Sequence, residues 1–234
     1  MRSRLTCLCQ PKGYSPWLVI LNPSSIASAT REFDLEIYRL QSFTIPGKLR
    51  QFVETEHEFS TLLQILKRED LLLIPFRRKP ARESRFRARH SPGVFYGAQR
   101  LETAMVEIAY HQHRLLKSNE SLEIVTRSLV SFSAHLKAML LDVELLPGNS
   151  EIYSRTSYRA SQQLALEARE QGIAGIHFHS VRAKEPSSSF AVFDSSALTA
   201  KGNPPEPWLL TLTRSRIEFR SPLGLHEFEP AAWS

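Results

Sequence analysis

Helix-like and strand-like segments alternate along this chain without the regular strand–helix–strand rhythm of a doubly wound fold. Three segments have apolar residues at the helical period, and each is long enough to form an amphipathic helix. Several shorter runs are apolar, or alternate between apolar and polar residues, which is typical of strands in a buried sheet. We therefore expect one α+β domain with mixed sheets and flanking helices.

The helical segments and the strands can be placed by residue number. Apolar positions at Phe59, Leu62, Leu63 and Leu66 predict an amphipathic helix within 53–67. The other helices are expected over 100–117 and over 158–171, where Gly172 provides a C-terminal cap. Strands are expected over 33–43, 93–98, 127–132, 139–146, 175–180, 190–198 and 209–219, with a short buried run at 71–76 that ends near Pro75.

Composition and charge limit the class of protein. The chain has 234 residues, of which 42% are hydrophobic and 23% are charged, so it can bury a core. Its net charge of +6 favours anionic partners such as nucleic acid, acidic lipid or a phosphorylated small molecule. No apolar run approaches the ~18 residues of a membrane span. Cys7 and Cys9 are too close for an easy disulfide, so a reducing, cytoplasmic setting is expected.

Glu107 lies on the polar side of the predicted helix 100–117. Successive helical residues advance by about 100°, which places Glu107 about 120° from the apolar stripe. This position puts Glu107 on the same face as Thr103, Tyr110 and Arg114. The carboxylate is therefore either a solvated surface group or a functional one, and the pattern alone favours the surface.

The other candidate residues also have two interpretations each. The basic segment 77–90 is either a solvated loop or a phosphate clamp, because arginine binds phosphate oxygens bidentately. Tyr96 is expected in the core, and Ser180 either starts a turn or presents its hydroxyl to a partner. Seven of the fourteen residues in the basic segment are basic: Arg77, Arg78, Lys79, Arg82, Arg85, Arg87 and Arg89.

The histidines do not predict a metal site. On a helix His111 and His113 point about 200° apart, so they cannot share a metal ion. His177 and His179 would share one face of a strand, which leaves them as a weak metal option. The sequence contains no GxxxxGK, GxGxxG, GxSxG or CxxC motif, and we predict neither a metal nor a bound cofactor.

The order of four motifs resembles the RES domain family. The matching segments are PFRR with SRFR, then PGVFYGA, then LETAMVEIAYHQ, and finally GIAGIHFHSVR followed by FAVFD. The arginine, glutamate and serine that give this family its name fit Arg85, Glu107 and Ser180. Tyr96 precedes Glu107 by eleven positions, which is similar to the family's tyrosine-to-glutamate interval. Arg77 stays an alternative to Arg85 for the arginine.

The resemblance implies an enzyme that degrades NAD and has a fold similar to ADP-ribosyltransferases. It implies that Glu107 stabilises the positive charge that develops on the ribose when the nicotinamide–ribose bond breaks. Arg85 or Arg77 would bind phosphates, Ser180 would bond to ribose or phosphate, and Tyr96 would stack on nicotinamide. NAD is then the substrate, and inorganic phosphate is an optional co-substrate in place of water.

The resemblance further implies the toxin of a toxin–antitoxin pair with an Xre-type antitoxin partner, through which contact with nucleic acid would be indirect. The domains are then an irregular leader (1–32), the RES-like catalytic domain (33–200) and a C-terminal strand extension (201–234). Two other functions are left open, a protein ADP-ribosyltransferase and a nucleic-acid-binding module without catalysis. Homodimer formation is also left open.

Overall fold

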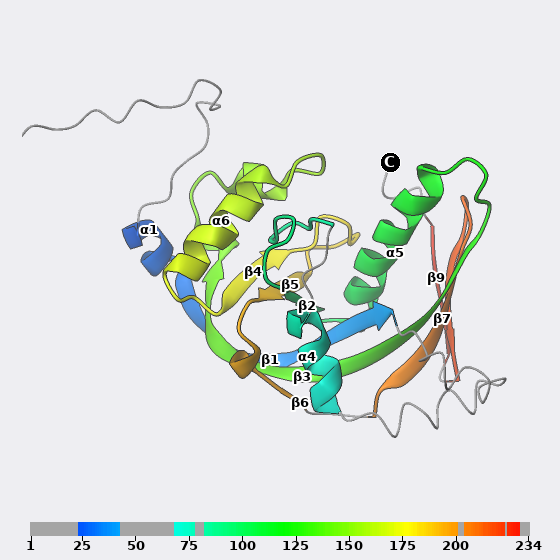
Figure 1. Ribbon diagram of the computed structural model, residues 1–234, viewed down its shortest axis with the longest axis horizontal. Helices are drawn as coiled ribbons and strands as arrows, with labels where there is room; N and C mark the ends of the chain where they lie inside the picture. The colour runs from blue at the N-terminus through cyan, green and yellow to red at the C-terminus, as the bar shows by residue number, and fades with distance from the viewer. Residues whose placement is uncertain (1–22, 43–67, 78–81, 201–203, 223, 230–234) are drawn as a thin grey trace, which may run out of the picture.

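The computed structural model describes residues 23–42, 68–77, 82–200, 204–222 and 224–229. The helix predicted within 53–67 lies outside these residues. The elements in chain order are α1 (Pro23–Ser28), β1 (Thr30–Ser42), α4 (Arg68–Arg77), β2 (Phe95–Ala98), α5 (Leu101–Lys117), β3 (Val125–Asp142), η1 (Val143–Leu145), η2 (Asn149–Tyr153), α6 (Arg159–Glu170), β4 (Gly175–His179), β5 (Ser188–Val192), η3 (Ser195–Ala197), β6 (Leu198–Ala200), β7 (Glu206–Leu212), β8 (Ile217–Ser221) and β9 (Gly224–Phe228) (Figure 1).

The strand β3 is one continuous element of 18 residues, and the prediction of two strands over 127–132 and 139–146 was wrong. The residues between those segments, SAHLKA, alternate between the apolar Ala134, Leu136 and Ala138 and more polar neighbours. This period of two allows the strand to continue, since Ala134 and Leu136 are buried and Ala138 is half-buried on one face. β3 pairs antiparallel with β1 over thirteen residues, from Thr30 opposite Leu141 to Ser42 opposite Leu129.

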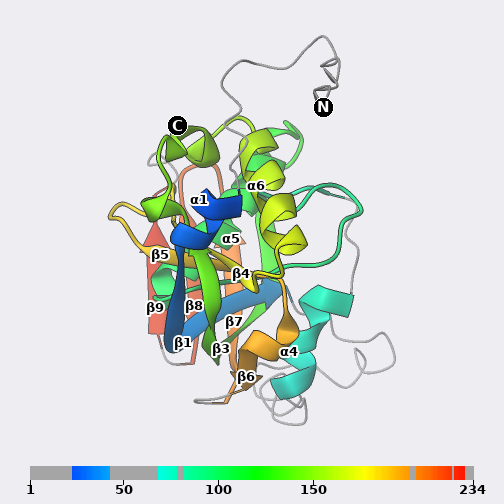
Figure 2. The same ribbon diagram turned by 90° about the vertical axis from the view of Figure 1, so that its left-hand side faces the viewer.

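All nine strands in the described part of the chain belong to one mixed sheet, which confirms the α+β class. β1 pairs with both β2 and β3, and the chain of pairings β1, β2, β5, β4, β3 therefore closes into a ring. The ring includes a short parallel pairing between β3 and β4, at Leu141 with Ile176 and Asp142 with His177. β7 pairs antiparallel with β3 outside the ring. β8 then pairs antiparallel with β7, and β9 with β8, so that these three strands extend the sheet (Figure 2).

The apolar run 71–76 forms a helix. It lies within α4, which continues through Pro75 to Arg77. Pro75 lies in the last turn of this helix, where it has no N–H to donate to the carbonyl of Leu71. Leu71 and Leu72 are buried against β-strand residues such as Phe95, and α4 contacts β6 and β2 at the lower side of Figure 1.

The helices α5 and α6 rise from the same side of the sheet, as Figure 1 shows. Met105 and Leu116 of α5 pack in a core cluster with residues of β7 and β8. Leu164 and Ala168 of α6 pack in a separate cluster with residues of β4. α6 ends as predicted, because Gly172 has a φ of 71° that suits glycine. The candidate site is built where α5 meets the segment that follows β4.

Both ends of the described chain contribute to the sheet. The segment 209–219, predicted to form strand structure, falls within β7 and β8, and β9 adds a third strand beyond it. The predicted leader 1–32 overlaps α1 and the first residues of β1, while its boundary and the other domain limits stay predictions. No helix among the described residues is long and apolar enough to cross a membrane.

Gly175 should be the glycine of the sheet that least tolerates a side chain. A Cβ there would lie 2.6 Å from the carbonyl oxygen of Ala191 and 3.0 Å from the Cα of Val192, both backbone atoms. We expect Gly175→Ala to lower the free energy of unfolding by about 1–3 kcal/mol, since β5 has to shift. Denaturant unfolding measures the change.

Gly97→Ala is the matched control. Its Cβ would meet Ile37 Cδ1 at 2.9 Å, the end of a side chain that can rotate. The loss of unfolding free energy should therefore be smaller than for Gly175→Ala. An equal loss in the two variants would show that the backbone contact at Gly175 is not the limiting one.

Candidate functional site

The carboxylate of Glu107 is held by two groups that follow β4. The Ser180 hydroxyl donates a hydrogen bond to Glu107 Oε1 over 2.5 Å. Arg182 Nη1 lies 3.5 Å from Glu107 Oε2. The side chain of Glu107 is 26% exposed, whereas that of Arg182 is 6% exposed. The polar face predicted for α5 is therefore the face that meets the segment after β4, and Glu107 is not a freely solvated group.

Ser180 is oriented by a turn that it starts. Its Oγ accepts the backbone N–H groups of Arg182 and Ala183, each over 3.2 Å. This is the local side-chain-to-backbone bonding that serine favours at turns. With both acceptor sites used, the hydroxyl proton is directed to Glu107. The two interpretations of Ser180, a turn residue and a functional hydroxyl, thus describe the same side chain.

Arg182 is a member of the site that the sequence analysis did not single out. Its guanidinium carbon lies 3.9 Å from the centroid of the Tyr110 ring, a cation–π distance. Its Nη2 lies 3.4 Å from the hydroxyl of Tyr158. Arg182 belongs to the segment GIAGIHFHSVR that resembles the family, but nothing in the spacing of that segment indicates that its arginine meets Glu107.

Arg85 enters the same cluster from the loop before β2. Its Nη1 donates to the carbonyl oxygens of Ile152, over 2.6 Å, and of Ser154, over 3.1 Å. Its guanidinium carbon lies 5.4 Å from the Tyr158 ring centroid. Burial lowers the pKa of Arg85, and the neighbouring positive charge of Arg182 lowers it further. The Glu107 carboxylate acts in the opposite direction on the same pKa.

Tyr96 fixes the loop that bears Arg85. Its hydroxyl lies 2.8 Å from Ser84 Oγ and accepts the backbone N–H of Phe86 over 3.1 Å. Burial raises the pKa of Tyr96, so its hydroxyl stays protonated. On the other side of the loop, Ser161 Oγ donates to the carbonyl of Arg85 over 2.6 Å. The proposed stacking of Tyr96 on nicotinamide stays a prediction beside this structural role.

Arg77 is placed away from this cluster. It is the last residue of α4, its side chain is 60% exposed, and its described partner is Asp70 at 3.4 Å. α4 packs against β6 and β2, whereas Glu107, Ser180 and Arg182 meet between α5 and the end of β4. Of the two candidate arginines, Arg85 is the one that shares a neighbour, Tyr158, with Arg182 of this cluster.

A cleft of about 530 Å³ opens beside the cluster. Tyr110 and Tyr158 line it and also contact Arg182, so they form a wall shared by the cleft and the cluster. The lining carries three arginines and a single carboxylate, which makes the cleft attractive to anions. Its lining residues are Glu83, Tyr110, Arg114, Arg155, Thr156, Ser157, Tyr158, Arg159 and Gln162.

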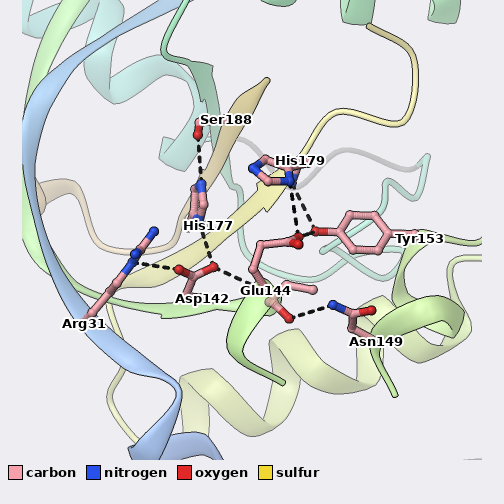
Figure 3. A network of polar contacts seen from close by, with 9 residues as sticks. Arg31, Asp142, Glu144, Asn149, Tyr153, His177, His179 and Ser188 are labelled. Carbon is pink, nitrogen blue, oxygen red and sulfur yellow. Dashed lines mark hydrogen bonds and ion pairs between the residues drawn. The ribbon is translucent and has the colours of Figure 1, made fainter. Parts of the chain in front are cut away.

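A second polar network lies at the junction of β3, β4 and β5 (Figure 3). His177 Nδ1 lies 2.8 Å from Asp142 Oδ1, and His177 Nε2 lies 3.0 Å from Ser188 Oγ. An ionised carboxylate only accepts hydrogen bonds, so Nδ1 donates to Asp142 and Nε2 accepts from Ser188. Arg31 Nε lies 2.7 Å from the second oxygen of Asp142.

This serine–histidine–aspartate order is the order found in hydrolase triads, but its surroundings are those of a core. The His177 ring lies 4.9 Å from Phe33 and 5.2 Å from Phe190, between centroids, and the residue is 3% exposed. None of its members lines the cleft. We therefore assign the network a structural role, which is to join β1, β3, β4 and β5.

The histidine pair on β4 lies within this region. His179 Nδ1 is 3.5 Å from Glu144, to which Tyr153 donates its hydroxyl hydrogen (Figure 3). Within the part of the chain that the structure describes, no three His, Cys, Asp or Glu side chains are grouped as a metal site requires. The ring nitrogens of His177 are both engaged with protein groups.

The chain belongs to the RES domain family. The model of this family matches residues 62–213, which include every predicted site residue and Arg182. Among solved structures, the chain is similar to one described as the M. tuberculosis MbcT–MbcA toxin–antitoxin complex. The identity is 12% and the TM-score 0.49, over 85% of this chain and 93% of that one. No curated protein matches the chain.

His177 should make the stability of the fold depend on pH. Burial lowers its pKa from 6.5, and the bond to Asp142 only partly opposes this. The unfolded chain then binds a proton more readily than the folded one. The stabilisation is complete above pH 6.5 and is lost as the pH falls below that value toward the lowered pKa. Denaturant unfolding between pH 7.5 and about pH 5 should show the decline.

His177→Asn should flatten this pH dependence, because the asparagine does not titrate. His90→Asn is the matched control, since His90 is exposed and its φ of 63° suits asparagine. The slope of unfolding free energy against pH should be the same for the control as for the unmodified chain. A slope for His177→Asn as steep as that of the control would exclude His177 as the source.

Tyr96→Phe should loosen the Arg85 loop. The change removes the acceptor for the Phe86 N–H and leaves that donor without its partner, which costs about 1–3 kcal/mol. Trypsin should then cut after Arg85 or Arg87 faster than in the unmodified chain. Tyr38→Phe is the control, because the Tyr38 hydroxyl has no hydrogen-bond partner among the residues described. Equal cleavage rates in both variants would remove the anchoring role.

Proposed function

We propose that this chain is an enzyme that degrades NAD by cleaving its nicotinamide–ribose bond. The observation that carries the proposal is the Glu107 carboxylate, which Ser180 holds in one orientation over 2.5 Å. Glu107 pairs with the buried Arg182, and the buried Arg85 belongs to the same cluster. The ring of Tyr110, which contacts Arg182, lines the arginine-rich cleft. Such a site places a fixed negative charge where a bound sugar would develop positive charge.

The reaction needs little more than this arrangement. The bond between the ribose C1′ and the nicotinamide nitrogen breaks, and its electron pair leaves with the nicotinamide, which becomes neutral. The ribose carbon acquires oxocarbenium character, which the Glu107 carboxylate stabilises. Water or inorganic phosphate then bonds to C1′ and loses a proton, giving ADP-ribose or its 1-phosphate. No general acid is required, because the leaving group is already positively charged before departure.

The neighbouring residues take supporting roles. Ser180 donates a hydrogen bond to Glu107, which fixes the orientation of the carboxylate. Arg85 supplies positive charge for the substrate's phosphates, as expected for a guanidinium at a phosphate site. Tyr96 holds the loop of Arg85 in place. The cleft lined by Arg114, Arg155 and Arg159 would receive the phosphate-bearing part of the dinucleotide.

We also propose that the enzyme acts as the toxin of a toxin–antitoxin pair in the cytoplasm, arresting growth by depleting NAD. This proposal rests on membership of the RES domain family. An antitoxin of Xre type would be the partner and would provide any contact with nucleic acid. A pull-down with that partner, followed by an NAD assay of the complex, should show binding and loss of turnover together.

Turnover of NAD by the purified chain tests the proposed activity. Products are separated by chromatography, with and without inorganic phosphate. Loss of NAD in water with release of ADP-ribose indicates a glycohydrolase, and loss only with phosphate indicates a phosphorylase. No loss in either condition would refute the proposal. Covalent ADP-ribose found on protein by mass spectrometry would instead indicate a transferase.

Glu107→Gln should lower kcat by roughly 10²–10³-fold, because the neutral amide cannot stabilise the developing charge. Glu102→Gln is the matched control on the same helix. Glu102 is 47% exposed and pairs with Arg100 at 3.7 Å, away from Ser180 and Arg182. Its variant should keep the turnover of the unmodified chain. Equal rates for both variants would show that Glu107 is not part of the chemistry.

A further inference from the structure

Two buried arginines of the cluster have hydrogen-bond donors without partners. Arg85 is 6% exposed and Arg182 is 8% exposed. Among the described residues, neither Arg85 Nη2 nor Arg182 Nε has a hydrogen-bond acceptor. Buried donors are normally paired, and a donor on a charged group is the most costly to leave unpaired. Each guanidinium is therefore prepared for an acceptor that the described chain does not supply.

The charges of the cluster point to an acceptor that is an anion. Glu107 pairs with Arg182, and no second carboxylate among the described residues forms an ion pair with either arginine. The two guanidinium groups are close enough that the charge of Arg182 lowers the pKa of Arg85. Two buried positive charges thus share one partly exposed negative charge. An added anion would remove this imbalance.

Tyr158 contacts both arginines and also lines the cleft. Its ring lies 5.4 Å from the guanidinium carbon of Arg85, and its hydroxyl lies 3.4 Å from Arg182 Nη2. It also lines the cleft, directly before α6 begins at Arg159. The contact with Arg182 is long for a hydrogen bond, so little is lost if the ring turns away. Movement of this side chain would remove the cover that Arg85 and Arg182 share, while Tyr110 would stay against Arg182.

We propose that Arg85 and Arg182 form a single anion site, covered by Tyr158, that takes a phosphate group entering from the cleft. Arg85 Nη2 and Arg182 Nε are the donors to the phosphate oxygens. The proposal deepens the NAD-degrading function and rests on it for the identity of the ligand. It assigns Arg182 a role in binding as well as the pairing with Glu107. The phosphate group is either that of free inorganic phosphate or one from the dinucleotide.

Binding of inorganic phosphate to the full chain tests the site without any turnover. Titration calorimetry should show phosphate binding, and Arg182→Gln should weaken it about tenfold or more, since a charge-assisted bond is lost. Arg182→Lys should recover part of the affinity, because it keeps the charge and lacks the Nε donor. Thermal unfolding of each variant verifies the fold and should show a phosphate-dependent rise wherever phosphate binds.

Arg169→Gln is the matched control for a partly buried arginine over an aromatic ring. The guanidinium carbon of Arg169 lies 4.0 Å from the Phe193 ring centroid, and its Nη2 lies 3.5 Å from the carbonyl of Gly93. Its phosphate affinity should equal that of the unmodified chain. Equal weakening by Arg182→Gln and Arg169→Gln would overturn the proposal, because the loss would then reflect general destabilisation.

A second titration with adenosine diphosphate separates the two sources of phosphate. If Arg182→Gln weakens only the nucleotide, the site takes a phosphate of the dinucleotide. If it weakens inorganic phosphate, the site takes the free anion. Absence of an Arg182-dependent effect in both titrations refutes the site. Tyr158→Ala should speed phosphate association in stopped-flow measurements, and Tyr158→Phe, which keeps the covering ring, should not.

The anion site and the NAD-degrading activity can each be refuted without refuting the other. Arg182-dependent phosphate binding by a chain that does not consume NAD would keep the anion site and remove the proposed activity. NAD consumption with an unchanged KM and no Arg182-dependent binding would keep the activity and remove the anion site. The two proposals can therefore be judged separately from one set of variants.

Discussion

The backbone pairing of β3 is the constraint on which the rest of the structure depends. This strand pairs with β1, β4, β6 and β7, so it joins the closed ring of strands to the antiparallel extension. Because β1 follows it over thirteen residues, the register of the ring is fixed by many hydrogen bonds. The parallel pairing with β4 then determines where Ser180 and Arg182 leave the sheet and reach α5.

Much of this fold could be predicted from period and composition. The helices near 100–117 and 158–171, the strand near 175–180 and the polar face of Glu107 all follow from local patterns. The continuity of β3 was missed because its middle residues are small or half-polar, although they keep the period of two. The run at 71–76 was not recognised as a helix because it is apolar on all sides and contains Pro75.

The candidate site was only partly accessible to sequence reasoning. Arg85, Glu107 and Ser180 were selected by their order in motifs, and the structure brings them into one cluster. Arg182 was missed because its importance depends on contacts with Tyr110 and Tyr158, which lie far from it in sequence. Tyr96 was predicted to be a core or stacking residue, and the hydrogen bonds by which its hydroxyl organises a loop were not foreseen. Hydrogen-bond partners of this kind depend on tertiary distances, which no local period encodes.

Hydroxyl groups do much of the positioning around the two arginines and the glutamate. Ser180 directs its proton to Glu107 while it closes a turn, and Tyr96 holds the loop of Arg85. Ser161 bonds to the same loop from α6. The bonds from Ser180 to Glu107, from the Phe86 N–H to Tyr96 and from Ser161 to the Arg85 carbonyl each join two different segments. The charged groups are therefore fixed by the assembled fold rather than by their own helix or strand.

The pairing of Glu107 with Ser180 has a consequence for synthesis of the chain. The ribosome delivers the glutamate 73 residues before the serine. A nascent polypeptide that has emerged only as far as α5 carries the carboxylate without the hydroxyl that orients it. The complete cluster forms only when β4 has docked beside β3 and the turn after it has closed. In the cell, the assembled site therefore forms only after most of the domain has left the ribosome.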